Sequence, residues 1–220
     1  MDKNVNKALI TKHSATLIAL LLNPEPITKA IFMGVEIHNI INDYNNKKES
    51  ENIEETIKIL NTNKDKMISE LKKLDDNEWE TVNKFILPKV FHEVKKEDEK
   101  EKIKYIMQGF LYSVNNKIYK KDIILLYYDV LNQLRALDIK ILESLDKSGK
   151  VDIKFSEEVK ENISIPVNYI YYKLEKLNIL DIAHELDYLA GLGEETIKFE
   201  NIKISKFGEQ FINFIFNREF

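Results

Sequence analysis

Apolar residues recur at helical spacing along most of this chain, and the spacing changes clearly to strand-like alternation only after Asn178. Before that point, Ile and Leu fall three or four positions apart with polar residues between them, as in amphipathic helices. After it, Ile197, Phe199, Ile202 and Ile204 follow a strand-like period. Only 6 Gly and 4 Pro occur in 220 residues, which disfavours a sandwich or barrel with many turns. The pattern predicts a mainly α chain with a little sheet near its C-terminus.

The first 135 residues predict one helical body. A loop is expected over the polar stretch from Asp43 to Glu51, and Pro88 is expected to kink or end the helix around it. The charged run from Glu93 to Lys102 alternates in sign, which predicts a solvated helix face or a loop that leads into a helix. Helices are expected over 7–22, 27–41, 53–74, from Asp75 or Asp76 to about Val90, over 103–114 and over 122–134.

Aromatic and aliphatic side chains are dense in the last two of these helices, where Tyr105, Phe110 and Tyr128 stand at helical spacing. Such a stripe indicates core packing. The chain has no cysteine, so it has no disulfide framework and a reducing compartment is expected. Its longest apolar run, Ala15 to Leu22, is shorter than the roughly 20 residues that cross a bilayer, so the expected location is the cytoplasm, without a membrane partner.

From residue 136 onward the pattern predicts a second domain. Asp138 is expected to cap a helix that ends at Ser148-Gly149, and Ser205 is expected to cap the last helix. Between them we expect helices over 156–161 and 164–177, a strand from Ile179, a turn at Gly191 and Gly193, and a strand over 196–204. The order helix, helix, helix, strand, long turn, strand, helix is that of a winged helix. The predicted architecture is therefore a helical bundle body, residues 1–135, followed by a winged-helix-like domain, residues 136–220, with a two-stranded wing.

Two segments of this domain resemble recurring winged-helix motifs. The segment Tyr172–Leu180 (YKLEKLNIL) resembles the leucine-x-x-leucine-glycine-leucine-isoleucine motif at the end of the third helix. The segment Ile204–Phe211 (ISKFGEQF) resembles the leucine-threonine-x-x-glycine-x-x-phenylalanine entry to the closing helix in many bacterial winged-helix proteins. Asn178 stands where glycine is usual, and asparagine tolerates the left-handed cap conformation that glycine supplies there.

A broader set of residues is similar to a group of poorly characterised bacterial and phage proteins, some of them described as abortive-infection-like. The resemblance implies a helical body with a winged-helix-like C-terminus, and a setting of phage–host conflict. It implies no catalytic residues. The matching residues are Leu134, Leu137, Asp138, Ile141, Leu142, Phe207, Gly208 and Phe211.

The winged-helix order raises the question of DNA binding, because the third helix of such a domain can enter the major groove. The segment from Arg135 to Phe220 carries 12 Lys plus Arg against 16 Asp plus Glu, although a DNA-binding domain normally has a basic surface. This balance favours a protein-facing role. The candidate contacts are Asn168, Tyr171, Tyr172, Lys173 and Lys176 on the exposed face of the helix, and Lys198 and Lys203 on the wing.

No catalytic, cofactor-binding or metal-binding motif stands out. The histidines His13, His38, His92 and His184 do not form a metal-ligand spacing such as His-x-x-x-His. The Gly191-Leu192-Gly193 pair is followed by two glutamates, which would repel phosphate, so a turn is the expected structure. We therefore assign no catalytic residue, cofactor or metal.

Two function classes follow. The first is a non-enzymatic interaction or regulatory protein in phage–host conflict, whose acidic winged-helix domain contacts a protein partner or a second copy. The alternative is a winged-helix transcriptional regulator whose helical body dimerises or senses a ligand. An exposed basic face on the helix 164–177, with a two-fold mate about 34 Å away, would favour the regulator. An enzyme is the least favoured class, since it would need a pocket with converging polar groups.

Overall fold

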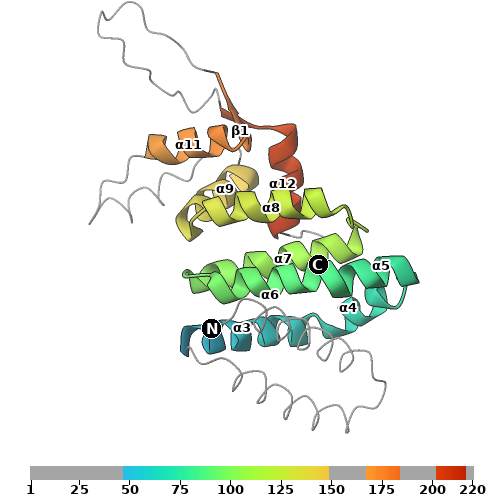
Figure 1. Cartoon of the computed structure of the whole chain (residues 1–220). Helices are drawn as coiled ribbons and strands as arrows, with labels where there is room; N and C mark the ends of the chain where they lie inside the picture. Colours follow the sequence, from blue (N-terminus) through green and yellow to red (C-terminus); the bar gives the residue numbers. More distant parts are fainter. Residues whose placement is uncertain (1–46, 149–166, 184–201, 217–220) are drawn as a thin grey trace, which may run out of the picture. The chain divides into compact units, whose positions relative to one another are not determined.

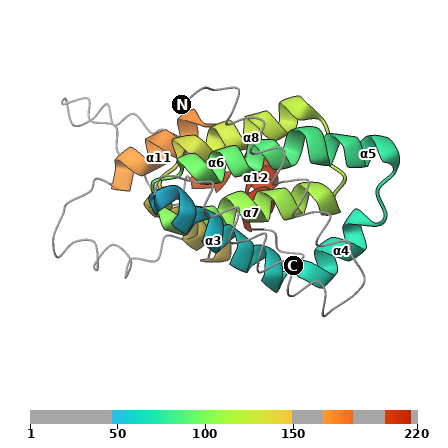
Figure 2. The ribbon, with the colours of Figure 1, turned by 60° about the horizontal axis from the view of Figure 1, so that its bottom comes forward.

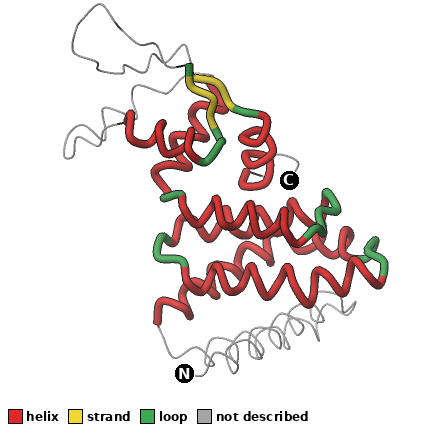
Figure 3. Tube along the Cα trace, turned by 45° about the horizontal axis from the view of Figure 1, so that its top comes forward, coloured by secondary structure: helices red, strands yellow, loops and turns green. Residues whose placement is uncertain are grey.

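The structure, a computed structural model, describes residues 47–148, 167–183 and 202–216 (Figure 1). These residues are mostly helical, with one small antiparallel sheet (Figure 3), which confirms the mainly α prediction. The elements are α3 (Lys47–Thr62), α4 (Lys64–Leu71), α5 (Asp76–Thr81), the π-helix η1 (Val82–Ile86), α6 (Leu87–Lys96), α7 (Lys100–Asn115), α8 (Lys121–Gln133), α9 (Ala136–Ser148), α11 (Val167–Lys176), β1 (Leu180–Ile182), β2 (Ile202–Ile204) and α12 (Lys206–Phe216). The helices predicted over 7–22, 27–41 and 156–161 lie outside the described residues.

The chain divides into two compact units. Unit 1 comprises Met1–Leu131 with Phe214–Phe220, and unit 2 comprises Asn132–Asn213. In unit 1, α3 packs against both α6 and α7, which also pack against each other (Figure 2). The apolar side chains of these helices are buried, as their spacing predicted. Among them are Ile53, Ile57, Leu60, Val90, Val94, Ile103, Ile106 and Phe110.

Phe214 fills an aromatic cluster within unit 1. Its ring centroid lies 4.7 Å from that of Tyr127 and 5.3 Å from that of Tyr128. The Tyr112 ring meets it edge-on at 6.3 Å. On α7, a Cβ atom added to Gly109 would lie 2.4 Å from Phe214 Cζ, so only glycine leaves space for the ring there. The aromatic residues of α7 and α8 are thus core residues, as predicted.

The predicted helix over 53–74 is interrupted at Asn63. Its side-chain amide donates to the Ile59 carbonyl at 2.9 Å, and its own carbonyl accepts the first hydrogen bond of α4, from the Met67 N–H at 3.0 Å. Asparagine favours such local bonds over an uninterrupted helix. Asp75 then caps α5 as predicted, with Glu78 completing a capping box.

Pro88 does not end the helix, and the turn that precedes it is a π-helix. The chain continues from α5 through η1 into α6, and Pro88 occupies the first turn of α6. In η1 the Leu87 N–H donates to the Val82 carbonyl, five residues back. Proline lacks an N–H and would clash with the carbonyl four residues earlier, and a π turn relieves that crowding.

The corner between α6 and α7 corrects two predictions. Lys47–Glu51 begins helix α3 rather than forming the predicted loop. The Asn52 amide of the same helix reaches the corner and donates to the carbonyls of Val94 (3.0 Å) and Glu97 (2.9 Å). The charged run over 93–102 does contain a loop that leads into a helix, but it is not all solvated. Lys102 is 4% exposed and its Nζ lies 2.8 Å from Glu97 Oε2. Glu93 is 3% exposed and pairs with Lys89.

Unit 2 contains the two strands. They pair antiparallel with Leu180 opposite Ile204, Asp181 opposite Lys203 and Ile182 opposite Ile202. The predicted strand over 196–204 is observed at Ile202–Ile204, and its earlier residues lie outside the described part. Before β1, Asn178 has φ 55°, and the Ile179 N–H donates to the Leu174 carbonyl at 2.9 Å. This is the left-handed helix cap predicted for Asn178.

Candidate functional site on helix α11 and the strand pair

The residues predicted as contacts fall into three groups. Tyr171, Tyr172, Lys173 and Lys176 lie on α11 and Lys203 lies on β2. Asn168 is also part of α11, but its side chain lies outside the described part, as does all of Lys198. The described members divide between the buried and the exposed sides of their elements.

Lys173 is held within unit 2 by a carboxylate from another helix. Its Nζ lies 2.5 Å from Oδ2 of Asp138, and the side chains of Lys173 and Asp138 are 23% and 5% exposed. The same Oδ2 accepts the backbone N–H of Arg135 at 2.8 Å. Because α9 begins at Ala136, Asp138 is its third residue rather than the predicted cap residue. Its carboxylate both satisfies a free N–H at the helix start and binds Lys173.

Tyr171 is a core residue and not part of the exposed face, contrary to expectation. It is 0% exposed, next to the buried Ile170 and Leu174 on the same helix. Burial raises the pKa of its phenol well above the usual value. Residues 170, 171 and 174 define one buried side of α11, which fixes the side that remains for contacts.

The side of α11 opposite that core carries two tyrosines and a lysine. Tyr169, Tyr172 and Lys176 stand at positions i, i+3 and i+7, so they share one helix face, which we call the α11 stripe. Tyr169 is 66% exposed, and Lys176 is exposed as well. Tyr169 was not among the predicted contacts, although its spacing from Tyr172 and Lys176 was a signal in the sequence.

The end of α11 and the start of α12 are joined by Ser205. Its hydroxyl donates to the Asn178 carbonyl and accepts the Gly208 N–H at 2.8 Å, so Ser205 caps α12 as predicted. The Ser205 N–H also donates to the Ile179 carbonyl at 3.0 Å. A Cβ added to Gly208 would lie 2.1 Å from that carbonyl oxygen, so the close approach requires glycine.

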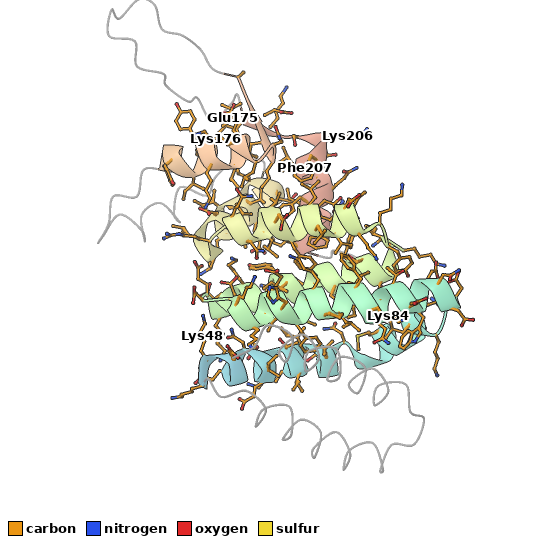
Figure 4. The ribbon with its side chains drawn as sticks, in the orientation of Figure 1. Lys48, Lys84, Glu175, Lys176, Lys206 and Phe207 are labelled. Carbon is orange, nitrogen blue, oxygen red and sulfur yellow. The ribbon has the colours of Figure 1, made fainter. Side chains whose placement is uncertain are left out.

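Three exposed lysines surround this junction. Lys176 precedes Asn178 by two residues, Lys203 precedes Ser205 by two, and Lys206 follows Ser205 directly. Figure 4 shows Lys176 at the end of α11 and Lys206 at the start of α12. Among the described residues, no carboxylate oxygen lies within 4.0 Å of the Nζ atom of any of the three. We call Lys176, Lys203 and Lys206 the junction lysines.

Charge is unevenly distributed along the C-terminal part of the chain. In the described part of unit 2, the exposed acidic residues are Asp181 and Glu209. The segment 184–201, which connects the two strands, contains five acidic residues and one lysine. The net negative charge that disfavoured DNA binding therefore comes mainly from residues outside the described part. The exposed basic residues of the described part of unit 2 are Arg135, Lys140, Lys147, Lys176, Lys203 and Lys206.

Neither a metal centre nor a membrane span is found in the part of the chain that the structure describes. Across 47–148, 167–183 and 202–216, no group of three His, Cys, Asp or Glu side chains is arranged to hold a metal ion. Within the same ranges, no helix has the length and hydrophobicity to cross a bilayer.

Comparison with known proteins gives no match: no protein-family model, no curated protein and no solved structure matches this chain. The chemistry of the α11 stripe and the junction lysines is therefore the basis for a functional proposal.

Proposed function

We propose that this chain is a non-enzymatic interaction or regulatory protein, and that it contacts another protein through the α11 stripe of a winged-helix-like C-terminal unit. The order of α9, α11, β1, β2 and α12 supports the winged-helix assignment. The Asn178 cap and the Ser205–Gly208 entry to α12 support it too, because they are the positions at which the chain resembles winged-helix motifs.

The ion pair between Lys173 and Asp138 is the observation that carries the proposal. It withdraws from the surface a lysine that a DNA-binding helix would use for phosphate contacts. The stripe that remains has two tyrosines and one lysine. Tyrosine is enriched among the residues that dominate protein–protein binding energy, and a 66% exposed tyrosine can bury much area in a contact.

The proposed setting follows from the resemblance and from composition. The absence of cysteine supports action in a reducing compartment such as the cytoplasm. The similarity to abortive-infection-like proteins supports a role in phage defence or in countering it. The identity of the partner protein tests the proposed compartment and the proposed role in phage–host conflict.

Affinity purification of the full chain from its native host tests the proposal. Three forms are compared: the wild type, the double variant Tyr169→Ala/Tyr172→Ala, and Leu126→Ala as a control, since Leu126 is 49% exposed on α8. We expect at least one protein to be retained by the wild type and the control and lost from the double variant. Equal retention by all three forms would refute the proposal. Circular dichroism should show the same helical content for all three.

DNA binding is the second candidate function, and the exposed basic residues of unit 2 favour it. Six are exposed against two exposed acidic residues in the described part of the unit, and affinity for duplex DNA depends on basic contacts. Fluorescence anisotropy with labelled genomic fragments at low ionic strength tests it. Binding that weakens steeply with salt, and that Lys176→Gln and Lys203→Gln reduce, would support the regulator. Absence of salt-sensitive binding would refute it.

A further inference from the structure

We propose that the α11 stripe binds an acidic polypeptide segment of a different protein. The carboxylates of that segment lie against the junction lysines. This inference rests on the proposed function and adds the chemistry of the partner. Besides the Lys173–Asp138 pair, it uses two further observations: the exposure of the junction lysines and the distribution of charge over the described part of unit 2.

The junction lysines form a group because hydrogen bonds fix the backbone around them. Ser205 bonds to both Asn178 and Ile179, so the end of α11 and the start of α12 are tied at one place. Lys176 and Lys206 lie within two residues of this link, on its two sides, and Lys203 precedes it on β2. These hydrogen bonds fix the backbone from which the three lysines extend, so the backbone need not be ordered when an anionic group binds.

Within the described part of the chain, no acidic side chain forms an ion pair with the junction lysines. Asp181 is opposite Lys203 in the strand pair, yet no ion pair within 4.0 Å joins the two side chains. Lys206 is the first residue of α12, where the positive end of the helix dipole disfavours a cation. A partner carboxylate near Lys206 would interact favourably with both the lysine and the helix end.

The two tyrosines and one lysine of the α11 stripe favour a polypeptide over a nucleic acid as the anionic partner. It joins two tyrosines to Lys176 on one face, and a segment that carries both apolar and acidic side chains would match both parts of that face. A duplex would meet only three exposed lysines here, with Lys173 bound to Asp138, whereas duplex binding relies on many phosphate contacts.

Site-specific photo-cross-linking in the native host tests the inference. The photoreactive residue p-benzoylphenylalanine replaces Tyr169 in the full chain, and mass spectrometry identifies the cross-linked peptides. The same measurement is made with Lys176→Glu/Lys206→Glu added, and with Lys72→Glu added as a control, because Lys72 is an exposed lysine in unit 1. We expect peptides of another protein with more Asp and Glu than Lys and Arg. We expect the double charge reversal to lower their yield about tenfold and the control to leave it unchanged.

The outcomes separate the inference from the proposed function. Cross-linked peptides without an acidic excess, at a yield that charge reversal does not change, would overturn the acidic partner and leave the protein contact standing. Peptides of this same chain would overturn it as well, because the partner would then be a second copy. If position 169 cross-links to nucleic acid or to no protein at all, both the inference and the proposed function fail.

Discussion

Lys173 on α11 and Asp138 on α9 form an ion pair in which the two charged atoms lie 2.5 Å apart and the carboxylate side chain is 5% exposed. The pair fixes which face of α11 remains at the surface of unit 2. It also makes Asp138 serve two partners, since the Arg135 N–H donates to the same oxygen.

Replacing Asp138 by Asn should destabilise unit 2. The amide oxygen can still accept the Arg135 N–H, but the charge opposite a largely buried lysine is lost, which we expect to cost about 1–3 kcal/mol of unfolding free energy. Urea denaturation measures the loss. Glu143→Gln is the matched control: its pair with Lys147 is more exposed, so a change below about 0.5 kcal/mol is expected. Equal effects of the two substitutions would contradict an internal role for Asp138.

Gly109→Ala should destabilise unit 1 even though alanine favours helices. The added Cβ would lie 2.4 Å from Phe214 Cζ, and the surrounding tyrosine rings leave the phenylalanine little room to move. We expect a net loss of about 1–3 kcal/mol. The double variant Gly109→Ala/Phe214→Leu tests the cause, because a smaller side chain relieves the clash. The two changes should therefore cost less together than the sum of their separate effects.

Lys117→Gly should stabilise the protein by up to about 1 kcal/mol. Lys117 follows α7 with φ 52°, a conformation that glycine adopts without a steric penalty. The substitution removes an exposed pair with Glu78, whose contribution in solvent is small. Thermal unfolding measures the gain. Lys117→Ala removes the same pair but keeps the Cβ, so any rise in melting temperature with alanine would contradict the explanation.

Stability should fall at alkaline pH. Burial, with added repulsion from Glu78, Asp75 and Glu70, raises the pKa of Tyr119 to about 12. The folded chain therefore favours the neutral phenol. The contribution of the neutral Tyr119 phenol to the free energy of unfolding is complete below the unfolded pKa of about 10. It is lost as the pH rises through about 12. Urea denaturation across this range measures the slope, and Tyr119→Phe should reduce it. A free energy of unfolding that stays constant over the range would refute the prediction.

Local features of unit 2 were predictable from the sequence. Asn178 and Ser205 occupy a helix end and a helix start, where the preference of a residue depends on its nearest neighbours in the chain. The structure confirms both. The two short strands were expected for the same reason, since alternation of apolar residues is a local pattern.

The composition of the exposed face of α11 was not predictable in this way. The partner of Lys173 lies 35 residues earlier in the chain, and the burial of Tyr171 depends on which side of the helix the rest of unit 2 covers. A helix with apolar and aromatic residues at several positions leaves that side ambiguous. The same limit applies to Lys102 and Glu93, which look like solvated charges in the sequence but are buried in unit 1.

The central claim is that the α11 stripe makes the contact with the partner protein. Isothermal titration calorimetry with the purified partner tests it most directly, comparing the wild type with Tyr169→Ala. A tyrosine that anchors an interface contributes about 2 kcal/mol or more, so we predict that the dissociation constant rises roughly 30-fold. An unchanged dissociation constant, measured for a variant with wild-type stability, would contradict the claim.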